Sequence, residues 1–424
     1  MFYLLFFNIL FFAFVTWRRF DIGISLLFLL LPAYLIRLNF GALPSTLLEI
    51  MIWVVFVIWI IKIYKHSSLK AWFTTLKHII KQNPSLFIAI FLFLLAATIS
   101  IFTSINTRSA LGEWKAFYIE PFLIFIILIT YLKEEKQINN IIFALIISGL
   151  ATSLLSIFQH FTGWMVPWEF WENRNTYRVT GWYGYPNAVG LFLAPLVPLA
   201  IHFVKQNKNK LYFFTSIIFI PCAILAIFFA KSTGGLIGVL SGITLLLIFW
   251  KKTRKYILIF GVLSLLVLIF MPNNPVRDEL LMQDNSGQMR IAMWGETIEF
   301  LTNHPINGAG LASYKTLIYP YRVDKWIEVF HHPHNIFLTM WVNLGLLGLI
   351  GFVWILVWYF RIGFQNLQAT SYRLTPNLLA SMTAIIITGL VDSPYIKNDL
   401  ALIFWLLPAL MIISTATTRQ EEIN

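Results

Sequence analysis

Three histidines lie close together at the end of the longest polar interval of the sequence. They form the run His331-His332-Pro333-His334, which is followed by Asn335 and then by a long apolar stretch. A histidine at the entrance of an apolar helix can take a proton from a hydroxyl group, because imidazole titrates near neutral pH. His334 is therefore the candidate general base, and Asn335 beside it is a candidate for substrate binding.

The same histidines raise the alternative of a metal site. Adjacent histidines cannot all face one ion without further ligands from elsewhere in the chain. The single cysteine, Cys222, lies inside an apolar run and offers no such help. The pattern therefore favours a site without a metal, and no cofactor is expected.

An arginine upstream of the histidines is placed to meet an anion. Residues 289–302 have the period of an amphipathic helix, and one face of it carries Arg290, Trp294, Thr297, Ile298 and Leu301. Glu296 and Glu299 are expected off that face. The planar fork of an arginine suits a diphosphate. An ion pair of Arg290 with Glu172 or Asp324 is the structural alternative, and the residues alone leave both open.

Two shorter polar intervals add candidates. The segment 178–187 begins with Arg178 and ends with Asn187 at the start of an apolar run, and Lys231 precedes another such run. We expect all three to bind substrate. The structural alternatives are that Arg178 snorkels and that Asn187 caps a helix. The aromatic segment 163–171 is interpreted as an interfacial belt rather than as a platform for sugar rings.

The elements that must position these residues are membrane helices. The chain is 58% hydrophobic and only 12% charged, and its apolar runs have the length of about 17–25 residues that spans a bilayer. Backbone groups in lipid must be satisfied within each segment, so an all-α polytopic membrane protein is expected. The expected helices cover residues 2–17, 22–38, 46–62, 85–105, 112–132, 138–160, 187–204, 211–230, 233–250, 256–271, 335–360, 375–391 and 398–416. The first of them is the least secure, which gives about 12–13 spans.

Lysine and arginine set the expected orientation. The larger share of the 31 basic residues falls in alternate short connections, which marks that side as cytoplasmic. The long polar interval, residues 272–334, is then external. It separates N-terminal helices in 1–271 from C-terminal helices in 335–424, within one integrated membrane domain. Residues 66–83 are expected to form an interfacial helix on the cytoplasmic leaflet. The net charge of +12 is thus explained by topology, and no nucleic-acid partner is expected.

Several of these motifs together resemble one family. His334-Asn335, then nine residues, then Gly345-Leu346-Leu347-Gly348 resembles the signature of the O-antigen ligase and O-antigen polymerase superfamily. Arg290 with Trp294, the segment 304–310 and the segment 178–187 resemble further stretches of that family. Their order, spacing and common external side make the resemblance strong.

The resemblance implies a metal-independent membrane glycosyltransferase in the cytoplasmic (inner) membrane of a bacterium. It implies transfer of a glycan from an undecaprenyl-diphosphate carrier to an acceptor hydroxyl, with His334 as general base and Arg290 on the diphosphate leaving group. A glycan, a glycolipid or a protein is the implied acceptor, and the sequence does not separate a ligase from a polymerase. This chain departs from the family at Thr233, where an arginine would supply a second diphosphate contact. Lys231 or Arg178 is expected to supply that charge instead.

Two other classes of function remain as alternatives. The first is an exporter of polysaccharide or lipid without glycosyl-transfer chemistry, for which buried charges would line a path across the membrane. The second is a structural partner in an envelope assembly, for which the loop residues would be dispensable.

Overall fold

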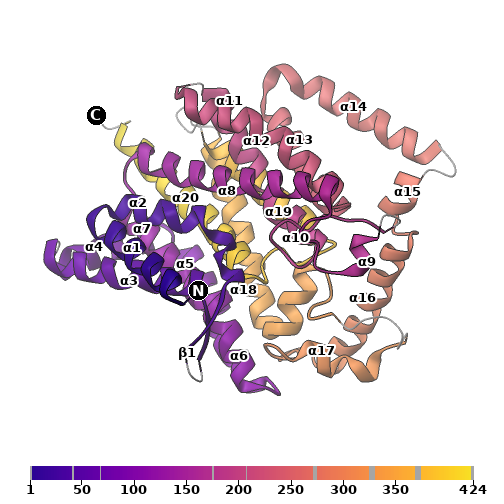
Figure 1. The fold of residues 1–424 in the computed structure, drawn as a ribbon, viewed down its shortest axis with the longest axis horizontal. Helices are drawn as coiled ribbons and strands as arrows, with labels where there is room; N and C mark the ends of the chain where they lie inside the picture. The colour runs from indigo at the N-terminus through magenta and orange to yellow at the C-terminus, as the bar shows by residue number, and fades with distance from the viewer. Residues whose placement is uncertain are drawn as a thin grey trace.

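The chain folds almost entirely into helices (Figure 1). The structure is a computed structural model, and it describes residues 2–40, 43–66, 68–173, 176–206, 208–270, 275–323, 330–367 and 374–421. Its only strands among these residues are β1 (Arg37–Phe40) and β2 (Leu43–Thr46), an antiparallel pair with Arg37 opposite Thr46. The predicted all-α polytopic membrane protein is confirmed.

Seven helical segments of the described chain are long and apolar enough to cross a membrane. They comprise α3 (Leu47–His66), α5 (Pro84–Thr103), α6 (Thr107–Glu113) continued by η2 (Trp114–Ile119) and α7 (Glu120–Tyr131), α8 (Glu135–Thr162), α10 (Pro186–Leu193) continued by α11 (Leu196–Gln206), α12 (Lys210–Phe229) and α18 (Ile336–Asn366). Shorter apolar helices accompany them: α1 (Phe2–Arg18), α2 (Phe20–Leu29), α13 (Thr233–Phe249), α19 (Thr375–Gly389) and α20 (Asn398–Glu421). A further helix, α14, covers Lys251–Phe270. Large side chains such as Phe7 and Phe91 are exposed on these helices, as contact with lipid requires.

The predicted helix over 22–38 is wrong in its second half. Helix α2 ends at Leu29, and the chain continues through the short 3₁₀ helix η1 (Leu31–Leu35) into β1. Pro32 explains the break, because proline has no N–H for an α-helical bond but fits the first turn of a new helix. The predicted span at 112–132 begins earlier, at Thr107, and contains the π-helical turn η2.

The predicted amphipathic helix at 66–83 is present as α4 (Leu69–Gln82). The Ser68 hydroxyl caps its first turn by accepting from the Ala71 N–H, and none of its residues is fully buried. Trp72, Leu76 and Ile79 pack on the core, whereas its lysines are exposed. In Figure 1, α4 lies at the opposite end of the molecule from the polar segment made by α15 (Pro275–Leu280), α16 (Asn285–Asn303) and α17 (Tyr314–Leu317). That it rests on the cytoplasmic leaflet stays a prediction.

The long polar interval contains four short elements. They are α15 (Pro275–Leu280), α16 (Asn285–Asn303), α17 (Tyr314–Leu317) and the 3₁₀ turn η3 (Tyr319–Tyr321). The last three of them surround a small apolar cluster made by Phe300, Leu301, Ala309, Tyr314, Ile318 and Val342. Because Val342 belongs to α18, this cluster fixes the loop against the membrane helices.

Two glycine positions allow the loop and α18 to touch backbone to backbone. Gly345 interrupts α18 with a φ of 70°, and a Cβ there would lie 2.0 Å from the Ile306 oxygen. Gly308 has a φ of 61°, and a Cβ there would lie 2.5 Å from the Val342 oxygen. Any other residue would be strained at either place. The contact is closed by hydrogen bonds from Leu346 N to Ile306 O (2.9 Å) and from Ala309 N to Val342 O (2.6 Å).

The predicted orientation can be tested by thiol labelling. After Cys222→Ala, the variant Asn285→Cys should react with a membrane-impermeant thiol reagent added to intact cells, because its side chain is exposed in the polar segment. Lys208→Cys should react only after the membrane is opened. Labelling of Lys208→Cys but not Asn285→Cys in intact cells would reverse the topology.

Candidate functional site

The candidate site is assembled around the loop that joins α19 to α20. Asp392 of this loop accepts a hydrogen bond from the His334 imidazole, with 3.0 Å between its Oδ1 and the histidine Nδ1. Its second oxygen, Oδ2, accepts from the Asn187 amide at 3.1 Å. Asp392 is buried, and burial alone would raise its pKa. The nearby His334 ring with its hydrogen bond, and next His332, together outweigh burial and hold that pKa well below its ordinary value.

His334 occupies the position that the sequence predicts, immediately before α18. Its φ of 48° lies in the left-handed region, which costs a non-glycine residue about 1–2 kcal/mol. The bond to Asp392 compensates for part of this cost and orients the ring. Because an ionised carboxylate only accepts hydrogen bonds, the proton belongs on Nδ1, and Nε2 is left as a proton acceptor.

Asn335 has a structural task beside His334. Its side chain caps α18 by accepting from the N–H groups of Phe337 (3.0 Å) and Leu338 (3.1 Å). Its amide donates to Leu390 O at 3.0 Å, which ties the start of α18 to the α19–α20 loop. Its predicted part in substrate binding stays a prediction.

Arg178 and Asn187 extend the site from the other side. One Arg178 nitrogen donates to the Asn187 side-chain oxygen (2.7 Å), and two further bonds go to the backbone oxygens of Ala230 (2.8 Å) and Lys231 (3.0 Å). Asn187 therefore bridges Arg178 to Asp392. It does not cap α10, because the N-cap position belongs to Tyr185.

Arg290 of α16 binds the loop that carries Asp392. Its Nε donates to Val391 O at 2.9 Å, and its Nη1 bonds to Ser286 one turn earlier in α16. Burial, and next the positive charge of Arg290, lower the pKa of Arg178 to about 10. The two guanidinium groups thus lie close enough to repel each other.

The structural alternative for Arg290, an ion pair with a carboxylate, is not found among the described residues. Glu172 does not contact it, and Asp324 lies outside the described residues. Arg290 therefore keeps hydrogen-bonding capacity for an anion.

The predicted packing face of α16 is partly wrong. Thr297 and Leu301 are buried as expected, but Ile298 is 51% exposed. Glu296, expected off this face, is buried and pairs with the equally buried Arg322 at 3.8 Å. The helix packs on the polar segment that follows it, and Arg322 there supplies a partner that apolar periodicity does not reveal.

Lys231 and Thr233 occupy the region of the absent family arginine. Lys231 has a φ of 47° and an exposed side chain, and its carbonyl oxygen accepts a hydrogen bond from Arg178. The Thr233 hydroxyl donates to the Glu279 carboxylate of α15. Thr233, at the position of the family arginine, is therefore hydrogen-bonded to an acidic side chain. The positive charges near it are those of Lys231 and Arg178.

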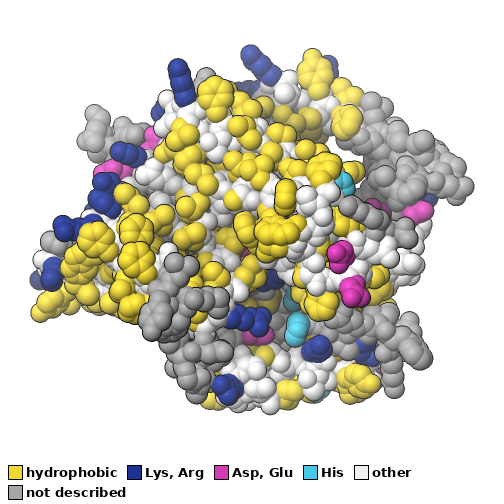
Figure 2. Space-filling model, in the orientation of Figure 1, with side chains coloured by type: hydrophobic (Ala, Val, Ile, Leu, Met, Phe, Trp, Pro, Cys, Tyr) yellow, Lys and Arg dark blue, Asp and Glu magenta, His cyan; other side chains and the backbone are white. Residues whose placement is uncertain are grey.

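Two residues of this region were missed by sequence reasoning. Asp392 and Lys397 lie in the short polar break between two apolar runs, and the only signal was the presence of charges there. The Lys397 ammonium lies over the Tyr183 ring, 5.6 Å from its centre. Burial lowers the pKa of Lys397, while Asp399 and Asp392 oppose that shift. In Figure 2, basic, acidic and histidine side chains gather in a hollow of an otherwise largely hydrophobic face.

A metal ion has one candidate set of ligands among the described residues. The ligand atoms of His332, His334 and Asp392 all lie within 4.8 Å of one another. Asp392 is thus the additional ligand that the histidine run lacks by itself. Burial, and next the nearby His334, lowers the pKa of His332 to about 3, so this histidine is neutral near pH 7. The predicted independence from metal stays a prediction.

Part of the chain is similar to known proteins. Residues 217–353 match the family model described as O-antigen ligase. A candidate polysaccharide ligase of Rickettsia bellii (strain RML369-C) is 29% identical over 163 residues, and one of Rickettsia felis (strain ATCC VR-1525 / URRWXCal2) is 26% identical over 155 residues. Each alignment covers 35% of this chain and 38% of the relative, so the similarity spans well under half of either protein.

The matched segment contains His334, Arg290 and Lys231, whereas Arg178, Asn187 and Asp392 lie beyond it and reach the site through the fold. The resemblance of this multi-pass membrane protein to the O-antigen ligase superfamily, expected from its motifs, is therefore confirmed, on a match that covers residues 217–353.

Proposed function

We propose that the chain is a membrane glycosyltransferase of the bacterial cytoplasmic membrane. It moves a glycan from an undecaprenyl-diphosphate carrier to an acceptor hydroxyl on the external face. The observation that carries this proposal is the chain of hydrogen bonds from Arg178 through Asn187 and Asp392 to His334. It joins the imidazole of His334 and the guanidinium of Arg178 in one connected set of side chains. The O-antigen ligase match and the names of the relatives support a glycan ligase role.

His334 acts on the acceptor. Its Nε2 takes the proton from the acceptor hydroxyl while the oxygen of that hydroxyl bonds to the anomeric carbon of the donor. The bond from that carbon to the diphosphate breaks, and its electron pair leaves with the diphosphate. Asp392 holds the imidazole in the required tautomer and stabilises the imidazolium that forms. Attack from the face opposite the diphosphate inverts the anomeric carbon.

Arg290 and Arg178 act on the donor. Negative charge develops on the diphosphate as the carbon–oxygen bond breaks, and fixed guanidinium groups stabilise it without reorganisation. The repulsion between Arg178 and Arg290 is relieved when an anion lies between them. Lys231, exposed beside Arg178, adds positive charge where the family arginine is absent.

An exporter without chemistry has less support. Glu49, buried near the start of α3, bonds Lys115 of η2 at 2.9 Å and Asn398 at the start of α20 at 3.2 Å. These contacts fasten helix ends together instead of lining a path. The acceptor, whether glycan, glycolipid or protein, belongs to the same proposal, since each offers a hydroxyl group.

The first test removes the proposed base and the proposed cation. His334→Ala and Arg290→Ala should each lower glycan transfer by about 10²–10⁴-fold, because each removes one source of transition-state stabilisation. Transfer from purified carrier-linked glycan is measured at equal protein abundance in membranes. His331→Ala is the matched control, since its side chain is exposed and has a smaller expected effect. A stable His334→Ala protein with near-parental transfer would leave His334 a structural role only.

The second test concerns Asp392. Asp392→Asn should reduce kcat by about 10²–10⁴-fold with little change in KM for donor, because an amide can hold the imidazole in the wrong tautomer. Asp284→Asn is the control, since either side chain caps α16 about equally well. Partial recovery in Asp392→Glu would support a positioning carboxylate. Unchanged kcat in Asp392→Asn would contradict this role.

The third test concerns metal. Transfer should survive exhaustive chelation, because proton acceptance and charge stabilisation are both assigned to side chains. The measurement is transfer after EDTA treatment and after addition of single divalent ions. Loss of activity that one particular ion restores would assign His332, His334 and Asp392 to a metal site instead.

A further inference from the structure

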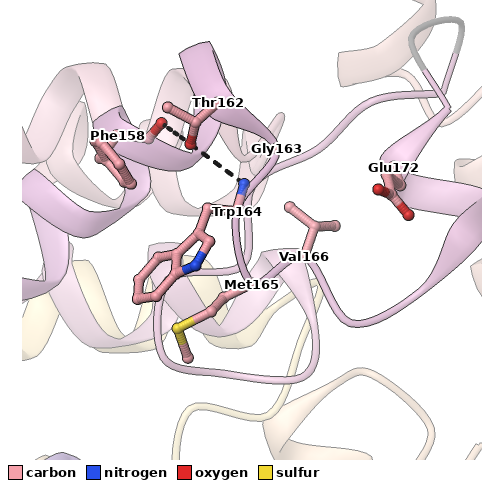
Figure 3. A pocket seen from close by; sticks show the side chains of 7 residues that line it. All are labelled: Phe158, Thr162, Gly163, Trp164, Met165, Val166 and Glu172. Carbon is pink, nitrogen blue, oxygen red and sulfur yellow. Dashed lines mark hydrogen bonds between the residues drawn. The ribbon is translucent and has the colours of Figure 1, made fainter.

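A shallow pocket of about 660 Å³ lies where α8 ends and the loop to α9 (Glu169–Glu172) begins. Figure 3 shows the rings of Phe158 and Trp164 on one side, Val166 in the middle and the Glu172 carboxylate on the other side. The pocket is outside the proposed catalytic residues. It belongs to the aromatic segment for which the sequence favours an interfacial belt.

The walls of this pocket combine two chemistries. Trp164 is 56% exposed and Met165 is 52% exposed, so an apolar ring face and a thioether are open to a ligand. Glu172 is exposed, and its carboxylate has no ion pair among the described residues. An aromatic face suits the C–H surface of a sugar ring, and a carboxylate accepts hydrogen bonds from hydroxyl groups. A lipid chain cannot hydrogen-bond to the carboxylate, which favours water or polar partners.

Direct contacts join the aromatic segment, which includes part of the pocket wall, to the segment that carries Arg178. The Trp168 indole donates to Gly184 O at 3.1 Å, and the Arg178 N–H donates to Trp171 O at 3.3 Å. The Trp171 ring also packs edge-on against Tyr185, with 5.8 Å between ring centres. The aromatic segment therefore packs against the connection between α9 and α10 that carries Arg178. A glycan whose diphosphate is bound by Arg178 can extend over the aromatic segment.

We propose that this pocket is a subsite for a sugar residue of the carrier-linked glycan, one that lies beyond the sugar attached to the diphosphate. The sugar recognised here has free hydroxyl groups and no acidic group, because Glu172 would repel a uronic acid. The ring packs on Trp164, and two hydroxyl groups bond to Glu172. This inference rests on the proposed transferase function and adds donor specificity to it.

The test compares two donors in the full-length protein. One is the complete glycan on undecaprenyl diphosphate, extracted from the native host, and the other is the same carrier with only its first sugar. Trp164→Leu keeps an apolar side chain but removes the ring, and Glu172→Ala removes the carboxylate. Each should raise KM for the complete donor roughly tenfold, the loss expected from one aromatic or hydrogen-bonded contact. KM for the one-sugar donor should not change.

The control is Phe170→Leu, an exposed aromatic residue of α9 that does not line the pocket. It should leave KM for both donors unchanged. Equal KM values for parent and Trp164→Leu with the complete donor would overturn the subsite, as would an equal rise with both donors. If the Trp164→Leu protein is less abundant in the membrane fraction but has an unaltered KM, the aromatic segment is an interfacial belt and not a subsite. Absence of transfer by the parent protein from either donor would instead refute the transferase proposal.

Discussion

The hydrogen bond between Asp392 and His334 is the interaction on which the site depends. A carboxylate buried within the protein is stable only if charge and hydrogen bonds surround it. Asp392 obtains them from His334 at the start of α18 and from Asn187 at the start of α10. Three regions distant in sequence are thereby joined at one side chain. The same loop also receives Arg290 through Val391 O and Asn335 through Leu390 O, so the base and the donor-side arginines share one support.

Backbone contact between the polar segment and α18 gives that support its rigidity. Gly308 and Gly345 let two backbone segments of the chain approach more closely than any side chain would permit. The kink in α18 exposes N–H and C=O groups, which pair across this contact. Arg290 is therefore carried by a helix that is fixed at its far end, while its guanidinium reaches the α19–α20 loop. Fixed charges of this kind stabilise a transition state more than mobile ones, because no reorganisation is required.

Particular residues show how far the sequence could be followed. His334, Arg290, Arg178 and Asn187 are recognisable because each stands in a motif of fixed spacing, and the structure brings all four to one place. Asp392 stands in no such motif. Its importance arises from a contact across 58 positions in the chain, and periodicity carries no information about such pairs. Glu296 was misplaced for the same reason, since its partner Arg322 lies in the following loop.

The sequence by itself determined the helical membrane architecture, because bilayer thickness and backbone hydrogen bonding leave an apolar chain few other choices. It also determined which polar residues stand at helix entrances, where burial is expensive and a role is expected. Only the tertiary structure decided which of them meet. Whether Asn187 caps a helix or bridges two charges, and whether Arg290 meets a carboxylate or a carbonyl, depends on how α10, α16 and the α19–α20 loop pack. Those contacts are set by side-chain volume and backbone approach between distant segments, and local pattern does not encode them.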